Sequence, residues 1–128
     1  MNKLIIDVTS KKIFLMIISN ASIYNITHEN TKINYEKLTI IINDFLSSKS
    51  IKIADISAIY INQGSGSFAG IRNSMSVVKA FNVARNVDYY CYNLNDFEKE
   101  KNLSYENIPN LCKKYKIKKN LINPVYLS

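Results

Sequence analysis

Histidine, cysteine and tryptophan are scarce in this sequence, and their scarcity narrows the chemistry that the protein can perform. The chain has one histidine, His28, two cysteines, Cys91 and Cys112, and no tryptophan. The cysteines are far apart and lack the paired spacing of zinc ligands, so we expect no metal site of this kind. Two isolated thiols are typical of a reducing compartment, which favours a cytoplasmic location.

Long apolar runs are also missing. The longest one, Ile13 to Ile18, has the length of a strand, and the run from Leu4 to Ile6 ends at Asp7. A membrane-spanning helix needs about 20 apolar residues, and a signal peptide needs a longer apolar core than Leu4 to Ile6 provides. The sequence therefore predicts no membrane association.

Negative charge is in short supply. The 128 residues include 17 Lys and Arg against 10 Asp and Glu, which gives a net charge of +7, and 47% of them are hydrophobic. This length and apolar content suit one compact domain with a core. Five lysines gather near the C-terminus, at Lys113, Lys114, Lys116, Lys118 and Lys119. Because this run has no arginine and a single aromatic residue, we favour a solvated surface and keep RNA binding as an alternative.

Glycine is the most informative shortage. The sequence has only three glycines, Gly64, Gly66 and Gly70, between a predicted strand at 56–61 and a predicted helix at 71–85. They indicate a strand-to-helix turn, where α/β proteins often bind ligands or partners. The turn lacks the Gly-Lys-Ser/Thr ending of a phosphate-binding loop and the glycine spacing of a dinucleotide-binding turn. Its residue types alone leave a structural and a binding role open.

The rest of the chain predicts the element order βββαβαβ. Alternating hydrophobicity predicts three strands joined by short turns into an antiparallel meander, at 3–9, 13–19 and 21–27. Helical periodicity predicts a first long helix at 35–48, capped by Asn34. The remaining expected elements are the strand at 56–61, the helix at 71–85, a strand at 87–92 and short helical segments at 96–100 and 108–115. The fold class is thus α/β, with a mixed five-stranded sheet and two long helices.

Both predicted long helices carry candidate residues for a partner interface. On the first helix these are the apolar residues of one stripe, Tyr35, Leu38, Ile42 and Phe45. On the second they form a stripe of small residues, Ser74, Val77, Ala80 and Ala84. The first helix is apolar beyond its stripe, as at Ile40, and small residues allow another helix to approach closely. Which face is core and which is interface stays open.

Asp7 is the acidic residue best placed for chemistry. It ends the first apolar strand and is followed closely by Thr9 and Ser10. Such a carboxylate could face a metal ion or a phosphate. No second carboxylate, histidine or lysine is placed beside it in the pattern, and no nucleophile–base pair is recognisable. We therefore favour a carboxylate that caps the following turn, and predict no catalytic residue.

Two segments carry a resemblance to known families. Ile5-Ile6-Asp7-Val8-Thr9-Ser10 resembles the opening strand and turn of the actin/Hsp70/sugar-kinase superfamily (the ASKHA, RNase H-like fold). The segment from Gly64 to Arg72 resembles the Gly-Pro-Gly-Ser-Phe-Thr-Gly-Leu-Arg signature of the TsaB (YeaZ) family. The matching signature residues are Gly64, Gly66, Ser67, Phe68, Gly70 and Arg72. Lys79 and the closing Pro124-Val125-Tyr126-Leu127 also resemble that family, with Ser65 and Ala69 as departures.

The resemblance implies the N-terminal half of that fold. It covers residues 1–97 as one domain, with 98–128 as a short remnant of the second subdomain and a basic segment. It implies a non-catalytic subunit for the synthesis of N6-threonylcarbamoyladenosine (t6A) in tRNA. Such a subunit pairs with a TsaD-like catalytic protein through a helix bundle, and recruits a TsaE-like ATPase. ATP or ADP would then act only through the partners, and tRNA contact would be indirect.

Three alternatives stay open beside this interpretation. The apolar helices could join two copies of this chain into a homodimer. Asp7 and the glycine turn could bind a nucleotide in a phosphotransferase, although family members are roughly twice as long and bind nucleotide between their two halves. The lysines near the C-terminus could bind RNA, which would make binding strongly dependent on salt.

Overall fold

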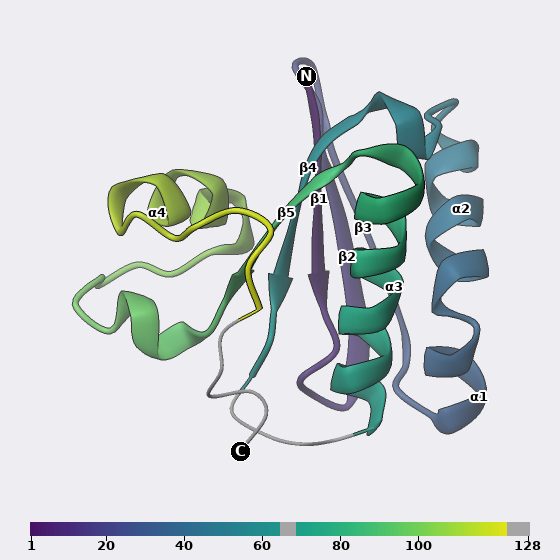
Figure 1. Ribbon diagram of the computed structural model, residues 1–128, viewed down its shortest axis with the longest axis horizontal. Helices are drawn as coiled ribbons and strands as arrows, with labels where there is room; N and C mark the ends of the chain where they lie inside the picture. The colour runs from purple at the N-terminus through teal and green to yellow at the C-terminus, as the bar shows by residue number, and fades with distance from the viewer. Residues whose placement is uncertain (65–68, 123–128) are drawn as a thin grey trace.

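One mixed five-stranded sheet forms the centre of the protein (Figure 1). The computed structural model describes residues 1–64 and 69–122. The strands are β1 (Asn2–Asp7), β2 (Lys12–Ile18), β3 (Ile23–Glu29), β4 (Ile56–Asn62) and β5 (Asp88–Tyr92). Their order across the sheet is β3-β2-β1-β4-β5. The predicted strands are confirmed, with ends that differ by one or two residues.

The sheet combines the two kinds of pairing that the element order implies. β1, β2 and β3 form the predicted antiparallel meander, and β4 and β5 join it in parallel. Asp7 at the end of β1 lies beside Asn62 on β4, which in turn lies beside Tyr92 on β5. The carboxyl ends of the three parallel strands therefore meet at one edge, where open α/β sheets usually bind ligands.

The helices follow the predicted order, but the first long one differs from the prediction in its middle and at its start. They are α1 (Lys32–Glu36), α2 (Leu38–Ser48), α3 (Ala69–Arg85) and α4 (Ile108–Lys114), with 3₁₀ turns at Ile53–Asp55, Leu94–Phe97 and Tyr105–Asn107. The predicted first helix is divided at Lys37, whose backbone leaves helical geometry at ψ 16°. The described part of the chain contains no helix long and apolar enough to cross a bilayer.

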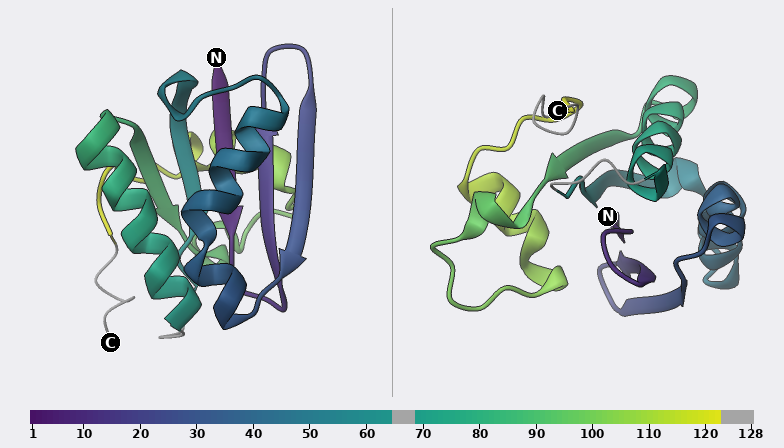
Figure 2. Two further views of the ribbon diagram at one scale, coloured as in Figure 1. Left: turned by 90° about the vertical axis from the view of Figure 1, so that its right-hand side faces the viewer. Right: turned by 90° about the horizontal axis from the view of Figure 1, so that it is seen from below.

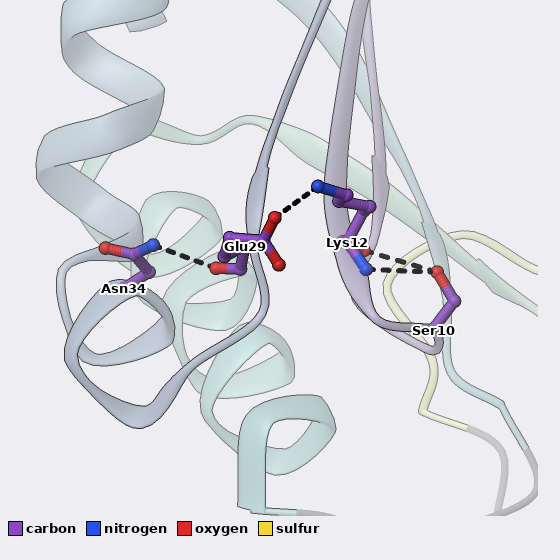
Figure 3. A network of polar contacts seen from close by, with 4 residues as sticks. All are labelled: Ser10, Lys12, Glu29 and Asn34. Atoms are coloured by element: carbon purple, nitrogen blue, oxygen red, sulfur yellow. Dashed lines mark hydrogen bonds and ion pairs between the residues drawn. The ribbon is translucent and has the colours of Figure 1, made fainter.

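The predicted cap at Asn34 is wrong. The helix begins three residues earlier than expected, because Thr31 has an extended backbone and its hydroxyl accepts a hydrogen bond from the Asn34 backbone amide. The Asn34 side chain instead donates to the carbonyl of Glu29 at 2.9 Å (Figure 3). Glu29 also forms an ion pair with Lys12 on the neighbouring strand, so these contacts tie the end of β3 to β2 and α1.

The helices α1, α2 and α3 cover one face of the sheet (Figure 2). Leu4 and Ile6 of β1 point to this side and join a core built mainly from aliphatic side chains. Leu38, Ile42 and Ile71 from the helices complete it and are at most 1% exposed. Alternation along the strands explains this core, because successive side chains point to opposite faces.

Residues 94–122 cover the other face of the sheet (Figure 1), apart from Ile122 at the end of the segment, which packs against the core of the helical face. Ile5 of β1 and Tyr60 of β4 point to this side, and Ile108, Leu111 and Cys112 of α4 pack on them. Asn120 fastens the end of the segment to the edge of β5, since its backbone amide donates to the Tyr89 carbonyl at 2.7 Å. The part predicted as a short remnant therefore shares a core with residues 1–97.

Candidate functional site

Asp7 is the centre of a buried polar network at the carboxyl edge of the sheet. It is 5% exposed, and its oxygen Oδ1 accepts hydrogen bonds from the Thr9 backbone amide at 2.9 Å and the Thr9 hydroxyl at 2.6 Å. Oδ2 accepts from Nδ2 of Asn62 at 3.1 Å and from the Tyr105 hydroxyl at 2.9 Å. The carboxylate thus caps the turn after β1, as predicted, and it also binds the segment that covers the sheet.

Asn62 connects this network to the glycine turn. Its Oδ1 accepts a hydrogen bond from the Gly64 backbone amide at 2.8 Å, while its Nδ2 donates to Asp7. Gly64 has φ 60°, a left-handed conformation that favours glycine, although four other described residues of the chain, such as Asn120, adopt a similar φ. The predicted signature residues Gly66, Ser67 and Phe68 lie outside the described residues.

Gly70 fixes how closely α3 approaches α1. A Cβ atom at Gly70 would lie 3.1 Å from Cδ2 of Tyr35, which is tighter than ordinary contact. Nδ2 of Asn73 donates to the Tyr35 carbonyl one turn further along. The signature glycine is therefore a packing residue between two helices. Arg72 is exposed beside it on the outer side of α3.

A cavity of about 230 Å³ lies next to Asp7 on the side covered by residues 94–122. Tyr92 and Tyr105 line it together with aliphatic side chains such as Leu103. Burial, the charge of Asp7 and the hydrogen bond to Asp7 raise the pKa of Tyr105, so its hydroxyl stays protonated and donates. Burial also raises the pKa of Tyr92, whose hydroxyl has no hydrogen-bond partner among the described residues. A small polar group could bind here.

The acidic groups at this edge are few. Among the described residues that line the cavity, Asp7 is the only carboxylate, and its two oxygens already accept four hydrogen bonds. Within residues 1–64 and 69–122 there is no group of three or more histidine, cysteine, aspartate or glutamate side chains that could hold a metal ion. The described edge therefore offers hydrogen bonds and apolar contact to a ligand.

The predicted interface residues divide into two groups. Leu38, Ile42, Phe45 and Ser74 are buried in the protein's own core and are at most 4% exposed. Tyr35 and Val77 are half-buried, and Ala80 and Ala84 are exposed. The stripe of the first helix faces its own sheet because that sheet presents a wide aliphatic surface. Only the small residues of α3 remain on the outside.

An apolar residue that the sequence reasoning missed lies beside those small residues. Val83 is 74% exposed on α3, between Ala80 and Ala84. Helical spacing could have grouped it with the predicted stripe, because Val83 follows Ala80 by three residues. Ser76, seven residues before Val83, is also exposed. We call Ser76, Ala80, Val83 and Ala84 the outer face of α3.

The strand order and the helical layer define an α/β fold of the RNase H-like, ASKHA type, which confirms the fold class predicted from the sequence. YeaZ from Pseudomonas aeruginosa has the same arrangement, with a TM-score of 0.65 at 15% identity over 78% of this chain and 49% of that chain. A second structure, of an uncharacterized protein with similarity to peptidase YEAZ from the same organism, aligns with a TM-score of 0.65 at 16% identity, over 78% of this chain and 49% of that one.

A third comparison covers more of the chain with weaker agreement. Thermus thermophilus RuvC in complex with a Holliday junction substrate aligns with a TM-score of 0.53 at 10% identity, over 98% of this chain and 86% of that chain. No protein-family model matches the sequence, and no curated protein matches it. The chain spans about half the length of the YeaZ structures that it matches. The predicted relation to a shortened YeaZ is confirmed at the level of the fold.

Proposed function

We propose that this protein is a non-catalytic subunit of the machinery that synthesises t6A in tRNA, and that it binds a TsaD-like catalytic protein. Two independent observations support the proposal. The fold matches the YeaZ structures over 78% of this chain. The segment from Gly64 to Arg72 also resembles the TsaB signature in sequence, with Gly64 at a positive φ that favours glycine and Gly70 in close contact with Tyr35.

The outer face of α3 is the surface that carries this proposal. It is exposed along a helix of 17 residues, and its side chains are small or apolar. Alanine and serine allow a partner helix to approach closely, and Val83 offers a side chain that can be buried in the contact. Arg72 and Lys79 flank the face and favour a partner surface with acidic residues.

The experiment is co-purification with a TsaD-like protein, with the mass of the complex measured by light scattering. We expect a heterodimer, and we expect Val83→Glu to abolish it because a charge would be buried without a partner. Ile23→Glu is the matched control, since it places the same charge on a 44% exposed apolar residue of β3, at the edge of the sheet opposite to β5. A stable homodimer that Val83→Glu dissociates would instead support the homodimeric module.

The role in t6A synthesis needs its own measurement. TsaD-like and TsaE-like proteins, ATP and the activated threonylcarbamoyl donor are incubated with tRNA, with and without this protein, and t6A is measured by mass spectrometry of nucleosides. We expect formation to require this protein and to be lost in Val83→Glu. If the complex forms and this protein leaves t6A formation unchanged, it is a binding partner without this function.

A further inference from the structure

A second hollow lies on the face covered by residues 94–122, at the end of the sheet opposite to Asp7. Its volume is about 500 Å³, and α4 forms one wall of it. The charged side chains that line it are Lys3 from β1 and Lys113 and Lys116 from the region of α4. No acidic residue is among the described residues that line it. The hollow is therefore a concentrated site of positive charge.

These three lysines have no ion pair in the described structure, unlike Lys114 and Lys119 in the lysine run near the C-terminus. Lys114 is paired with Glu100 at 2.8 Å, and Lys119 is 3.6 Å from Asp88. Lys113 and Lys116 are exposed, and Lys3 is half-buried at the start of β1. Acidic side chains thus neutralise part of the lysine run, while Lys113 and Lys116 beside the hollow are left unpaired, as is Lys118 outside it. The separation in sequence of the three lysines around the hollow, from residue 3 to residue 116, hides this grouping.

Two stacked tyrosines line the same hollow. Tyr60 on β4 and Tyr90 on β5 are paired in register, with ring centroids 5.0 Å apart and an angle of 9° between the ring planes. Tyr60 is 7% exposed and Tyr90 is half-buried, so Tyr90 is the ring that a ligand can reach. Burial, together with Tyr90 and Cys112, raises the pKa of Tyr60 to about 12, so this wall stays neutral beside the lysines.

We propose that this hollow binds single-stranded nucleic acid, with phosphates on Lys3, Lys113 and Lys116 and a base against Tyr90. Lysines alone would suit any polyanion, but an aromatic ring beside them matches the base that each phosphate carries. The volume is in the range of pockets that hold small ligands, and a nucleotide fits such a space. The site lies on the face of the sheet opposite to α3, so the inference does not depend on the proposed docking surface.

The test is fluorescence anisotropy of a labelled single-stranded oligouridine of about ten nucleotides, as RNA and as DNA. The logarithm of the binding constant should fall with the logarithm of salt concentration with a slope of about −2, since each phosphate contact on a single strand contributes about −0.7. Lys113→Ala combined with Lys116→Ala should reduce the slope by about 1.4. Lys32→Ala, which removes an exposed lysine on the opposite side of the sheet, is the control and should leave it unchanged.

The aromatic contact is tested separately. Tyr90→Leu should weaken binding about tenfold and Tyr90→Phe should not, since stacking needs the ring and not the hydroxyl. Thermal melts of both variants verify that each is folded. Absence of binding to either oligonucleotide at low salt overturns the proposal. Equal binding of a duplex or of polyglutamate overturns it as well, because a purely electrostatic surface would behave in that way. The proposal is also overturned if the Tyr90→Leu variant is folded and binds as tightly as the unchanged protein.

Discussion

The two faces of the sheet are covered by different kinds of secondary structure. The face under α1, α2 and α3 is filled mainly by leucine, isoleucine and valine from regular helices and strands. The opposite face lies under 3₁₀ turns and the short helix α4, and all ring–ring contacts among the described residues are on this side. Both the cavity beside Asp7 and the lysine-lined hollow open on this side. The helical side also has a hollow of about 500 Å³, at the start of α3 between Tyr35, Gly70 and the turn after β1, and the described residues that line it include neither a tyrosine pair nor a lysine cluster.

This difference assigns separate roles to the two faces. The helical face offers the smooth outer side of α3, which suits another helix. The irregular face offers hollows lined by tyrosine, lysine and one aspartate, which suit small groups or a nucleic acid strand. A protein of 128 residues could in this way bind a partner and a second ligand at the same time.

Removal of residues 98–128 should have the largest effect of the changes that test this difference between the two faces. It deletes Ile108 and Leu111 and exposes Ile5 and Tyr60 to water. Burial of a Leu or Ile side chain stabilises by about 1.5–3 kcal/mol, so two such residues amount to about 3–6 kcal/mol, much of the stability of a typical small domain. We expect loss of cooperative thermal unfolding by circular dichroism. A truncated chain that melts like the full one would show that the helical face and the sheet fold without the second layer.

Leu38→Ala probes the helical face. Leu38 is fully buried, and the cavity left by this change should lower the free energy of unfolding by about 2–5 kcal/mol in chemical denaturation. Ile40→Ala is the matched control on the same helix, because Ile40 is 59% exposed and its truncation should change stability by about 0.5 kcal/mol or less. Similar losses in both variants would mean that the outer side of α2 is also covered.

The helical face was predictable to a large extent from sequence, and the opposite face was not. Tyr35, Leu38, Ile42 and Phe45 recur at helical spacing, so the stripe could be recognised. The stripe alone does not reveal what covers it, which is why its assignment as core or interface stayed open. On the opposite face the decisive contacts join distant residues, such as Tyr105 and Asp7, 98 positions apart. Hydrophobic periodicity shows which residues share a face of one helix or strand, so it could not predict this contact. The turn-capping role of Asp7 could be predicted, because Thr9 is close to it in sequence.

Each of the two cysteines lies in the core on a different face of the sheet, so each can serve as a probe of that face. Cys91 belongs to the helical core and Cys112 to the opposite one. Burial raises the pKa of both thiols from 9.0 to about 12, whereas the unfolded chain ionises near 9. The unfolded state therefore loses protons first as pH rises, and stability that is complete below pH 9 should decline between pH 9 and 12. The slope is about 1.4 kcal/mol per pH unit for each thiol.

Urea denaturation at pH 9 and pH 10 measures this slope. A variant with both Cys91→Ala and Cys112→Ala should lose less stability over the same interval, since only tyrosines and lysines then titrate.

In the unchanged protein, an alkylating reagent at pH 8 should modify Cys112 before Cys91, because short helices and turns open more readily than a sheet covered by long helices. Faster modification of Cys91 would show that the helical face opens more readily than the opposite face.

Tyr105→Phe should have the smallest effect of these changes. It removes the hydrogen bond to Asp7 and retains the ring, which stacks on Phe14 with centroids 4.1 Å apart. Asp7 keeps its contacts with Thr9 and Asn62, so the expected loss in the free energy of unfolding is about 1 kcal/mol. Tyr115→Phe is the control in the same layer, since its hydroxyl donates to the more exposed Glu100 and its loss should cost less. Equal losses in the two variants would mean that the buried carboxylate does not anchor the second layer, and that apolar packing alone holds it on the sheet.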